Sequence, residues 1–318
     1  MNNKISELIN EFIDYKIKNG FIYSTARFHL NKYYEYLSLN YPNEQIPSKA
    51  SVTSFLSAHS DKPGSLHNAA AALRELSKYL ISIGYKNAYI IPYKKVSLPT
   101  PVQPYLFTDK EIEKFFYECD NLLFDSHVPK RAVVLPAMYR LHYCCGLRCK
   151  ETRTLKCENI HLQDCYLDIL QSKGPKSRRI FISYELSHYL QSYDAVINAM
   201  LPNRLYFFPS RNDTPYSPMQ FERNFLKIWY SAFPKKKKDG VSVRAYDFRH
   251  HFAYSNMNRW LKEGKDLNVM LPYLMRYMGH QDLKSTLYYF HLVPDIYPTI
   301  REKVSCFEDF LPKVKHNE

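Results

Sequence analysis

The first segment whose residues could do chemistry is Gly146-Leu147-Arg148, with Glu151 three residues after the arginine. We expect Gly146 to end one helix and Arg148 to open the next. A guanidinium offers forked donors and a helix amino terminus adds positive potential, so this position suits an oxyanion or a phosphate. Glu151 can brace the arginine. The segment therefore indicates stabilisation of a negatively charged oxygen.

Further candidate residues lie in later segments of the chain. Arg249 lies three residues after Tyr246, and on a helix two residues at this spacing share a face. His280 directly follows Gly279, which would break the preceding apolar helix and present the imidazole at a turn. Tyr289 lies nine residues beyond His280. Each of these signals is weak when it is taken alone.

Lys173 is the last candidate, and it lies in a turn between two short β-prone runs at residues 166–172 and 178–183. Two such runs around a Gly-Pro turn predict a β-hairpin. Two arginines, a hairpin lysine, a histidine and a downstream tyrosine, in this order, make a much stronger signal than any one of them.

Helices are expected to position most of these residues. An apolar stripe over residues 66–83 recurs at spacings of three and four residues, and Gly84 closes it. Residues 4–18 and 24–39 show similar, weaker periodicity, and residues 48–59 are predicted to form a shorter helix. The amino-terminal part is therefore predicted to be a small helical bundle.

A proline-rich linker follows this bundle. Four prolines between residues 92 and 107 bias the chain to extended conformations, and this stretch ends at Thr108 and Glu111, which match a helix capping box. We expect a helical domain at 1–95, a linker at 96–107 and a second, mostly helical domain at 108–318. The predicted fold class is mainly α with a small β-hairpin or sheet.

Composition narrows the function classes. The 318 residues suffice for two domains, and 44 Lys and Arg against 31 Asp and Glu give a net charge of +13, which favours an anionic partner. No run approaches the roughly 18 apolar residues of a membrane span, and the amino terminus lacks the apolar core of a secretory signal. These features exclude a membrane or secreted protein and favour a soluble intracellular one.

The lysine-rich stretch Pro234–Gly240 is expected to be a charged loop, either solvated or in contact with phosphates.

Glycine and cysteine usage argue against nucleotide and metal sites. The chain has only 8 Gly, and it contains neither of the glycine-rich phosphate-loop motifs. Four cysteines lie between residues 144 and 157, with His142 and His161 nearby, but no CxxC pair occurs. We favour small buried side chains over a zinc site. No metal or cofactor is expected.

In these motifs the chain resembles a tyrosine recombinase of the phage integrase family. The family's first arginine box, Gly-Leu-Arg-x-x-Glu, matches residues 146–151, and its hairpin lysine matches Lys173. Its second box, His-x-x-Arg-His, matches Arg249 and His250 but has Tyr246 in the first position.

The family's Leu-Gly-His motif matches residues 278–280, and its nucleophile, nine residues later, falls on Tyr289. The resemblance is strong over residues 105–292. Over residues 1–95 it covers only the general architecture, and there it implies a core-binding domain that clamps DNA. The resemblance also implies that residues 108–318 form the catalytic domain.

The resemblance implies a site-specific DNA recombinase that cleaves and rejoins DNA through a 3′-phosphotyrosine. Tyr289 would attack the phosphate, whose developing charge needs the fixed cations Arg148 and Arg249. His280 would donate a further hydrogen bond. Lys173 would protonate the leaving 5′-oxygen. None of these steps calls for a cofactor.

Two tyrosines leave alternatives open. Tyr246 stands where the family usually has His, and a phenol can donate a hydrogen bond but is a poor base at pH 7. We hypothesise that it positions the phosphate, with a structural role as the alternative. Tyr288 is adjacent to the expected nucleophile, but the nine-residue offset from His280 favours Tyr289.

The resemblance also implies partners and a location. Double-stranded DNA would be bound by a homotetramer assembled on paired recombination sites, which exchanges strands through a Holliday junction. Apolar positions over 295–310 would suit docking onto a neighbouring protomer or packing in cis. We expect a cytoplasmic, nucleoid-associated protein that acts in integration, excision or resolution.

Two other functions use the same residues. The first is a type IB topoisomerase-like activity, against which the helical module before the linker argues. The second is a DNA-binding relative with impaired catalysis, for which Tyr246 is the only hint.

Overall fold

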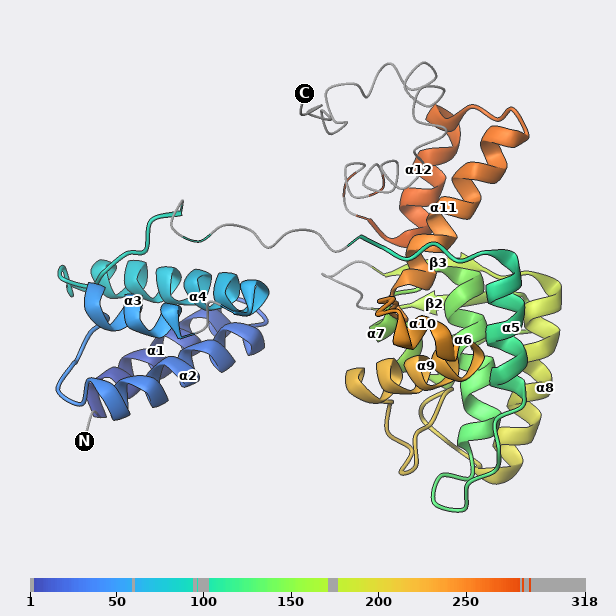
Figure 1. The fold of residues 1–318 in the computed structure, drawn as a ribbon, viewed down its shortest axis with the longest axis horizontal. Coiled ribbons are helices and arrows are strands. Elements are labelled where there is room, and N and C mark those ends of the chain that lie inside the picture. Colours follow the sequence, from blue (N-terminus) through green and yellow to red (C-terminus); the bar gives the residue numbers. More distant parts are fainter. Residues whose placement is uncertain are drawn as a thin grey trace. The chain divides into compact units, whose positions relative to one another are not determined.

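The chain divides into two units in the computed structural model, Met1–Val102 and Gln103–Glu318 (Figure 1). The structure describes residues 3–58, 61–93, 96, 103–170, 177–280, 282 and 286. Each unit encloses its own apolar core. None of the described helices combines the length and the apolar character that crossing a bilayer requires.

The first unit is a helical bundle, as predicted. It consists of α1 (Asn3–Lys18), α2 (Ser24–Asn40), α3 (Lys49–Ser57) and α4 (Pro63–Ser82). α4 packs against the other three helices, and its predicted stripe is buried at Ala69, Leu73, Leu76 and Leu80. Ile83 lies just beyond the end of the helix and is exposed.

The second unit is also mostly helical. Its helices are α5 (Asp109–Asp120), α6 (Arg131–Cys145), α7 (Cys149–Arg153), α8 (Tyr184–Met200), α9 (Pro218–Ala232), α10 (Pro234–Lys238), α11 (Asp247–Lys262) and α12 (Leu267–Met278). The capping box predicted for α5 is confirmed. Thr108 Oγ1 accepts a hydrogen bond from the Glu111 amide at 3.3 Å, and Glu111 Oε2 accepts one from the Thr108 amide at 2.8 Å.

The prediction of a charged loop at Pro234–Gly240 is wrong for its first five residues, which form α10. Proline suits the first position of a helix because its φ is already helical. Lys236 does not extend into solvent, since its ammonium group donates hydrogen bonds to Glu111 and to the hydroxyl of Tyr105. α10 is therefore tied to the start of α5.

The predicted hairpin is confirmed as two strands of a small sheet. β2 (Tyr166–Ile169) pairs antiparallel with β3 (Arg178–Phe181), with Tyr166 opposite Phe181 and Ile169 opposite Arg178. The sheet has a third strand that the sequence did not predict, β1 (Ile160–His161), and the order is β1-β2-β3. The turn that contains Lys173 lies outside the described residues.

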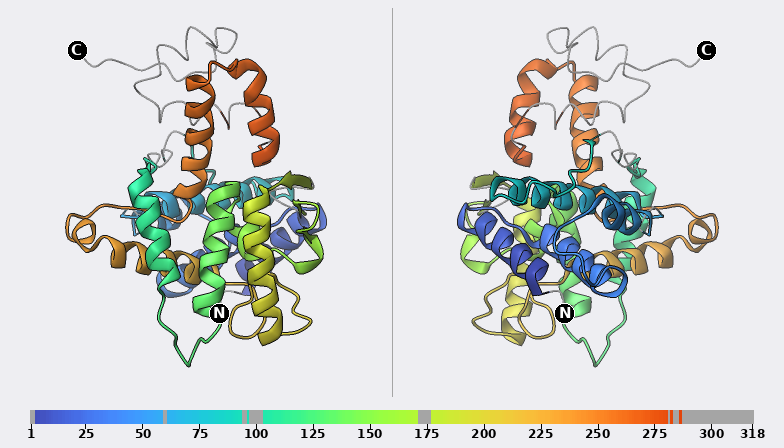
Figure 2. Two further views of the ribbon diagram at one scale, coloured as in Figure 1. Left: turned by 90° about the vertical axis from the view of Figure 1, so that its right-hand side faces the viewer. Right: turned by 90° about the vertical axis from the view of Figure 1, so that its left-hand side faces the viewer.

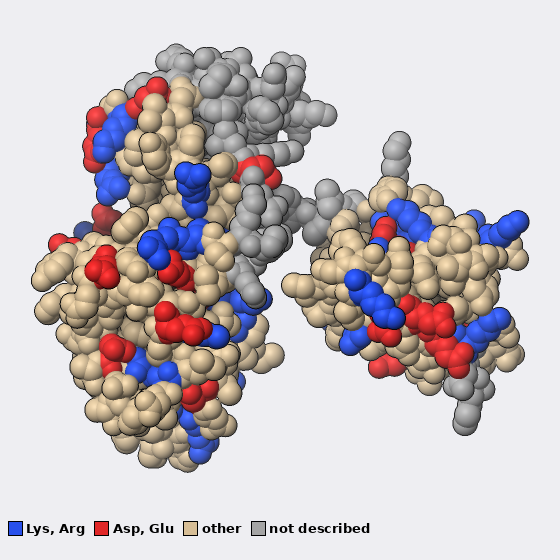
Figure 3. All heavy atoms as spheres, turned by 180° about the vertical axis from the view of Figure 1, so that it is seen from behind, with Lys and Arg blue, Asp and Glu red and all other residues tan. Residues whose placement is uncertain are grey.

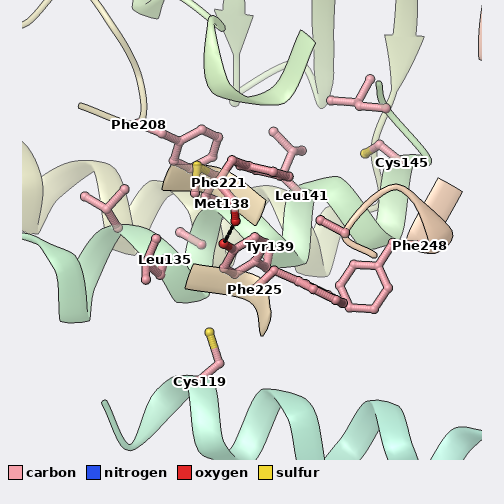
Figure 4. Packing of buried hydrophobic residues seen from close by; sticks show 14 of the residues in the cluster. Cys119, Leu135, Met138, Tyr139, Leu141, Cys145, Phe208, Phe221, Phe225 and Phe248 are labelled. Carbon is pink, nitrogen blue, oxygen red and sulfur yellow. Dashed lines mark hydrogen bonds between the residues drawn. The ribbon is translucent and has the colours of Figure 1, made fainter. Parts of the chain in front are cut away.

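α6 lies within the core of the second unit (Figure 4). Its buried side chains include Leu135, Met138, Tyr139 and Leu141, and the Tyr139 hydroxyl donates a hydrogen bond to the Phe221 carbonyl at 2.7 Å. Because α6 is held along its length, the residues that follow its carboxyl end have a fixed position.

Two glycines in the left-handed conformation end the helices that lead to the candidate residues. Gly146 follows α6 with φ 54°, and Gly279 follows α12 with φ 68°. α11 and α12 pack side by side (Figure 2), and α11 also packs against α6. A Cβ at Gly146 would lie 2.4 Å from Cδ1 of Phe252 on α11, so only glycine fits there.

We expect Gly146→Ala to lower the free energy of unfolding more than Gly264→Ala. Gly264 has φ 68° and nothing within 4 Å of an added Cβ, so that variant should cost only the left-handed conformation, about 1–2 kcal/mol. Gly146→Ala must also displace Phe252, at about 1–3 kcal/mol more. Urea unfolding of both variants measures the difference, and equal losses would contradict this account of the α6–α11 contact.

Candidate active site

Arg148 is held where α6 ends and α7 begins, as predicted. Its Nη1 donates to Glu151 Oε1 at 2.7 Å, and its backbone amide donates to Glu151 Oε2 at 2.9 Å. Its Nη2 donates to the carbonyl oxygen of Gly279 at 2.6 Å. The expected bracing by Glu151 is therefore confirmed, and the arginine also contacts the end of α12.

Arg249 is fully buried in the first turn of α11. Its Nη1 donates to the Gly146 carbonyl at 2.6 Å, and its Nη2 donates to the Met278 carbonyl at 2.8 Å. The same Nη2 lies 3.0 Å from His280 Nε2. One guanidinium thus joins the carboxyl ends of α6 and α12 and brings His280 to the same place.

His280 is a neutral acceptor in this arrangement. Arginine has only donors, so Nε2 accepts from Arg249, and the ring proton lies on Nδ1, which donates to Thr286 Oγ1 at 2.8 Å. Burial, together with the charges of Arg249, Arg148 and Arg178, lowers the pKa of His280 from 6.5 to about 3. The predicted donation from His280 to a phosphate would thus require exchange of its contact with Arg249.

A third guanidinium, that of Arg178 in β3, was not predicted from the sequence. Its Nη1 and Nη2 donate to the two carboxylate oxygens of Glu151 at 3.0 and 2.9 Å, and its Nε donates to the Tyr277 carbonyl at 2.7 Å. The signal that could have found it is alternation along the strand. Arg178 shares a face with buried Ile180, whereas Arg179 and Phe181 face outward.

The three guanidinium groups lie largely out of solvent. The side chains of Arg148 and Arg178 are 21% and 10% exposed, and Arg249 is 0% exposed. By contrast, the face shown in Figure 3 carries Lys and Arg interspersed with Asp and Glu. Because charges act more strongly away from water, this buried cluster is better suited to stabilising an anion than scattered surface cations are.

Tyr246 lies at the start of α11, one turn before Arg249, and is 37% exposed. Its ring makes an edge contact with His250, whose ring centroid is 5.0 Å away. Lys173 and Tyr289, the predicted acid and nucleophile, lie outside the described residues, as do Tyr288 and residues 295–310.

His142, one of the residues considered as zinc ligands, makes other contacts. In the described part of the chain, no group of three or more His, Cys, Asp or Glu side chains could hold a metal ion. His142 is fully buried, and its Nε2 donates to the Ala245 carbonyl at 3.0 Å while its Nδ1 accepts from Thr152 Oγ1 at 2.9 Å. This neutral imidazole joins α6 to α7 and to the segment that leads into Arg249.

Residues 106–295 match the phage integrase family, which is well over half of the chain. The chain is 24% identical over 312 residues to the tyrosine recombinase XerA of Pyrococcus horikoshii, covering 96% of each. The recombinase XerH bound to a palindromic difH substrate, in a post-cleavage complex, has a TM-score of 0.64 at 19% identity, over 90% of this chain and 79% of that one. A lambda integrase tetramer bound to a Holliday junction has a TM-score of 0.56 at 15% identity, over 87% and 77%.

The chain therefore belongs to the phage integrase family. It is a site-specific recombinase of the tyrosine class, an enzyme that cleaves and rejoins DNA. The resemblance drawn from the motifs and the predicted fold class are both confirmed, and the topoisomerase-like and impaired alternatives are not favoured.

The neutral state of His142 predicts how stability depends on pH. Burial lowers the pKa of His142 from 6.5 to about 4, so below pH 6.5 the unfolded chain binds a proton that the folded chain excludes. The free energy of unfolding should therefore fall between pH 7 and pH 5, by about 2 kcal/mol from this residue.

Urea unfolding of the native chain and of His142→Gln at both pH values isolates this contribution. Glutamine can make the same two hydrogen bonds but does not titrate. The variant should lose less stability on acidification. Equal losses in the two proteins would show that His142 is not held neutral by the fold.

Proposed function

We propose that this recombinase uses Tyr289 to form a 3′-phosphotyrosine, with Arg148 and Arg249 as ligands of the scissile phosphate. The observation that carries the proposal is the convergence of three elements at the end of α12. Arg148, at the start of α7, and Arg249, in α11, donate to the consecutive carbonyls of Gly279 and Met278, directly beside His280. Fixed cations at one point are what a developing phosphorane charge requires.

The contact between Arg249 and His280 suggests how the site responds to substrate. A nonbridging phosphate oxygen that accepts the hydrogen of Arg249 Nη2 would release His280 Nε2 from that bond. The negative charge of the phosphate would also raise the pKa of the imidazole, which could then take a proton from solvent and donate it as a hydrogen bond to the phosphate. Phosphate binding and the protonation of His280 would thus be coupled.

The remaining steps fall on residues that the sequence supplies. The phenolate oxygen of Tyr289 attacks phosphorus, the bond from phosphorus to the 5′-oxygen breaks, and Lys173 gives its proton to the leaving oxygen. Attack by a 5′-hydroxyl of the partner strand reverses these events and restores the phosphodiester. Tyr246, exposed one turn from Arg249, would donate a hydrogen bond to the same phosphate.

We also propose that the protein acts on double-stranded DNA as a homotetramer on paired sites, in integration, excision or resolution. The helical domain 1–95 and the catalytic domain 108–318 would clamp the duplex, joined by the linker 96–107. The DNA complexes of XerH and of the lambda integrase tetramer support this assembly. Residues 295–310 would dock onto a neighbouring protomer. The enzyme would act in the cytoplasm, at the nucleoid.

A suicide substrate tests the nucleophile. The full-length protein first selects a binding site from a pool of random duplexes, and a nick placed near the cleavage point then traps the covalent complex. The native chain and Tyr288→Phe should form the adduct, whereas Tyr289→Phe should form none, because only the phenol at 289 can attack. An adduct with Tyr289→Phe, resolved by denaturing gel, would refute the assignment.

A further inference from the structure

Arg178 is a charged side chain beside the site that the proposed chemistry does not use. It begins β3, the strand that follows the turn containing Lys173. Its guanidinium donates three hydrogen bonds to two other elements, to Glu151 in α7 and to the Tyr277 carbonyl in the last turn of α12. A single side chain therefore joins β3 to α7, which follows Arg148, and to the end of α12, which Arg148 and Arg249 also contact.

Both oxygens of Glu151 are shared between two arginines. Oε1 accepts from Arg148 Nη1 at 2.7 Å and from Arg178 Nη1 at 3.0 Å. Oε2 accepts from the Arg148 amide at 2.9 Å and from Arg178 Nη2 at 2.9 Å. The parallel bonds from Arg178 fix the plane of the carboxylate. The carboxylate in turn fixes the direction in which Arg148 points.

The packing around Arg178 reaches the residue before His280. A Cβ at Gly279 would lie 2.8 Å from Arg178 Nη1 and 3.0 Å from its Cζ. The guanidinium thus lies directly against the backbone that leads into His280. A shift of β3 would therefore displace both Glu151 and the end of α12.

Only a guanidinium can make these contacts together. Lysine has one ammonium nitrogen and cannot bond both carboxylate oxygens in parallel while it also reaches the Tyr277 carbonyl. A neutral amide would leave Glu151, whose side chain is 4% exposed, with one charged arginine partner instead of two.

We propose that Arg178 is a positioning residue for DNA cleavage, which holds Glu151 so that Arg148 is aligned and which links the hairpin to the end of α12. The inference rests on the proposed function of Arg148. Arg178 is not expected to touch the phosphate itself. Its loss should act on the rate of the chemical step and should act through Arg148.

The test compares Arg178→Gln with a matched control, Arg179→Gln. Arg179 is the next residue of β3 and also forms a forked pair with a carboxylate, that of Asp168 at 2.9 and 3.0 Å, but its side chain faces outward and is 52% exposed. Arg178→Gln should slow cleavage of the nicked duplex at saturating protein by about 100-fold, as expected for a misplaced catalytic group. Arg179→Gln should leave that rate unchanged.

Three further readouts separate positioning from a general structural role. DNA affinity should stay within about threefold of the native value, because the phosphate-binding cluster still carries two arginines. Arg178→Lys should not restore the rate, although it keeps the charge. In an Arg148→Ala background, Arg178→Gln should cause little further loss, because its effect passes through the missing arginine.

The outcomes distinguish this inference from the proposed function. If Arg148→Ala itself cleaves at the native rate, the proposed role of Arg148 fails. If Arg148→Ala is slow but both Arg178→Gln and Arg178→Lys cleave at the native rate, the inference alone is overturned. The same holds if the double variant loses the product of the two single rate losses. Should Arg178→Gln not fold, Arg178→Lys carries the same comparison.

Discussion

The site depends on arginine side chains that bind the carbonyl oxygens at the ends of two helices. The last carbonyls of a helix have no partner within it, and they carry the negative end of its dipole. Arg249 bonds the carbonyls of Gly146 and Met278, and Arg148 bonds that of Gly279. These bonds satisfy the ends of α6 and α12 and, at the same time, place the cations.

This arrangement explains why the helices must end as they do. Both end at a glycine in the left-handed conformation, in a chain that has only 8 Gly. Gly146 lies against Phe252, and Gly279 lies against the guanidinium of Arg178. A side chain at Gly146 would clash with Phe252, and one at Gly279 would clash with Arg178, which bonds the Tyr277 carbonyl at the end of α12. The same few contacts thus serve the fold and the proposed chemistry.

Local signals in the sequence predicted most of the fold and part of the site. The break at Gly146, the capping box at Thr108 and the hairpin can each be read from a few adjacent residues. The role of Arg178 could not be read from adjacent residues, because its partner Glu151 lies 27 residues away in the sequence. Lys236 was missed for the same reason, since only the folded chain shows that it turns inward to α5.

The sequence predicted residues of the candidate site, but not the contacts between them. The order of the motifs grouped Arg148, Arg249 and His280, but it could not show that His280 accepts a hydrogen bond from Arg249 and is held neutral. Protonation depends on burial and on charges from distant segments, and neither is encoded in local spacing.

The most direct test of the central claim is a charge-neutral scissile phosphate. Replacing one nonbridging oxygen with a methyl group removes the charge that the arginines are proposed to stabilise. On the normal phosphodiester, Arg148→Ala should slow cleavage by about 100-fold or more. On the methylphosphonate the same substitution should have a much smaller effect. Equal losses on both substrates would contradict the claim that this buried cluster binds the phosphate.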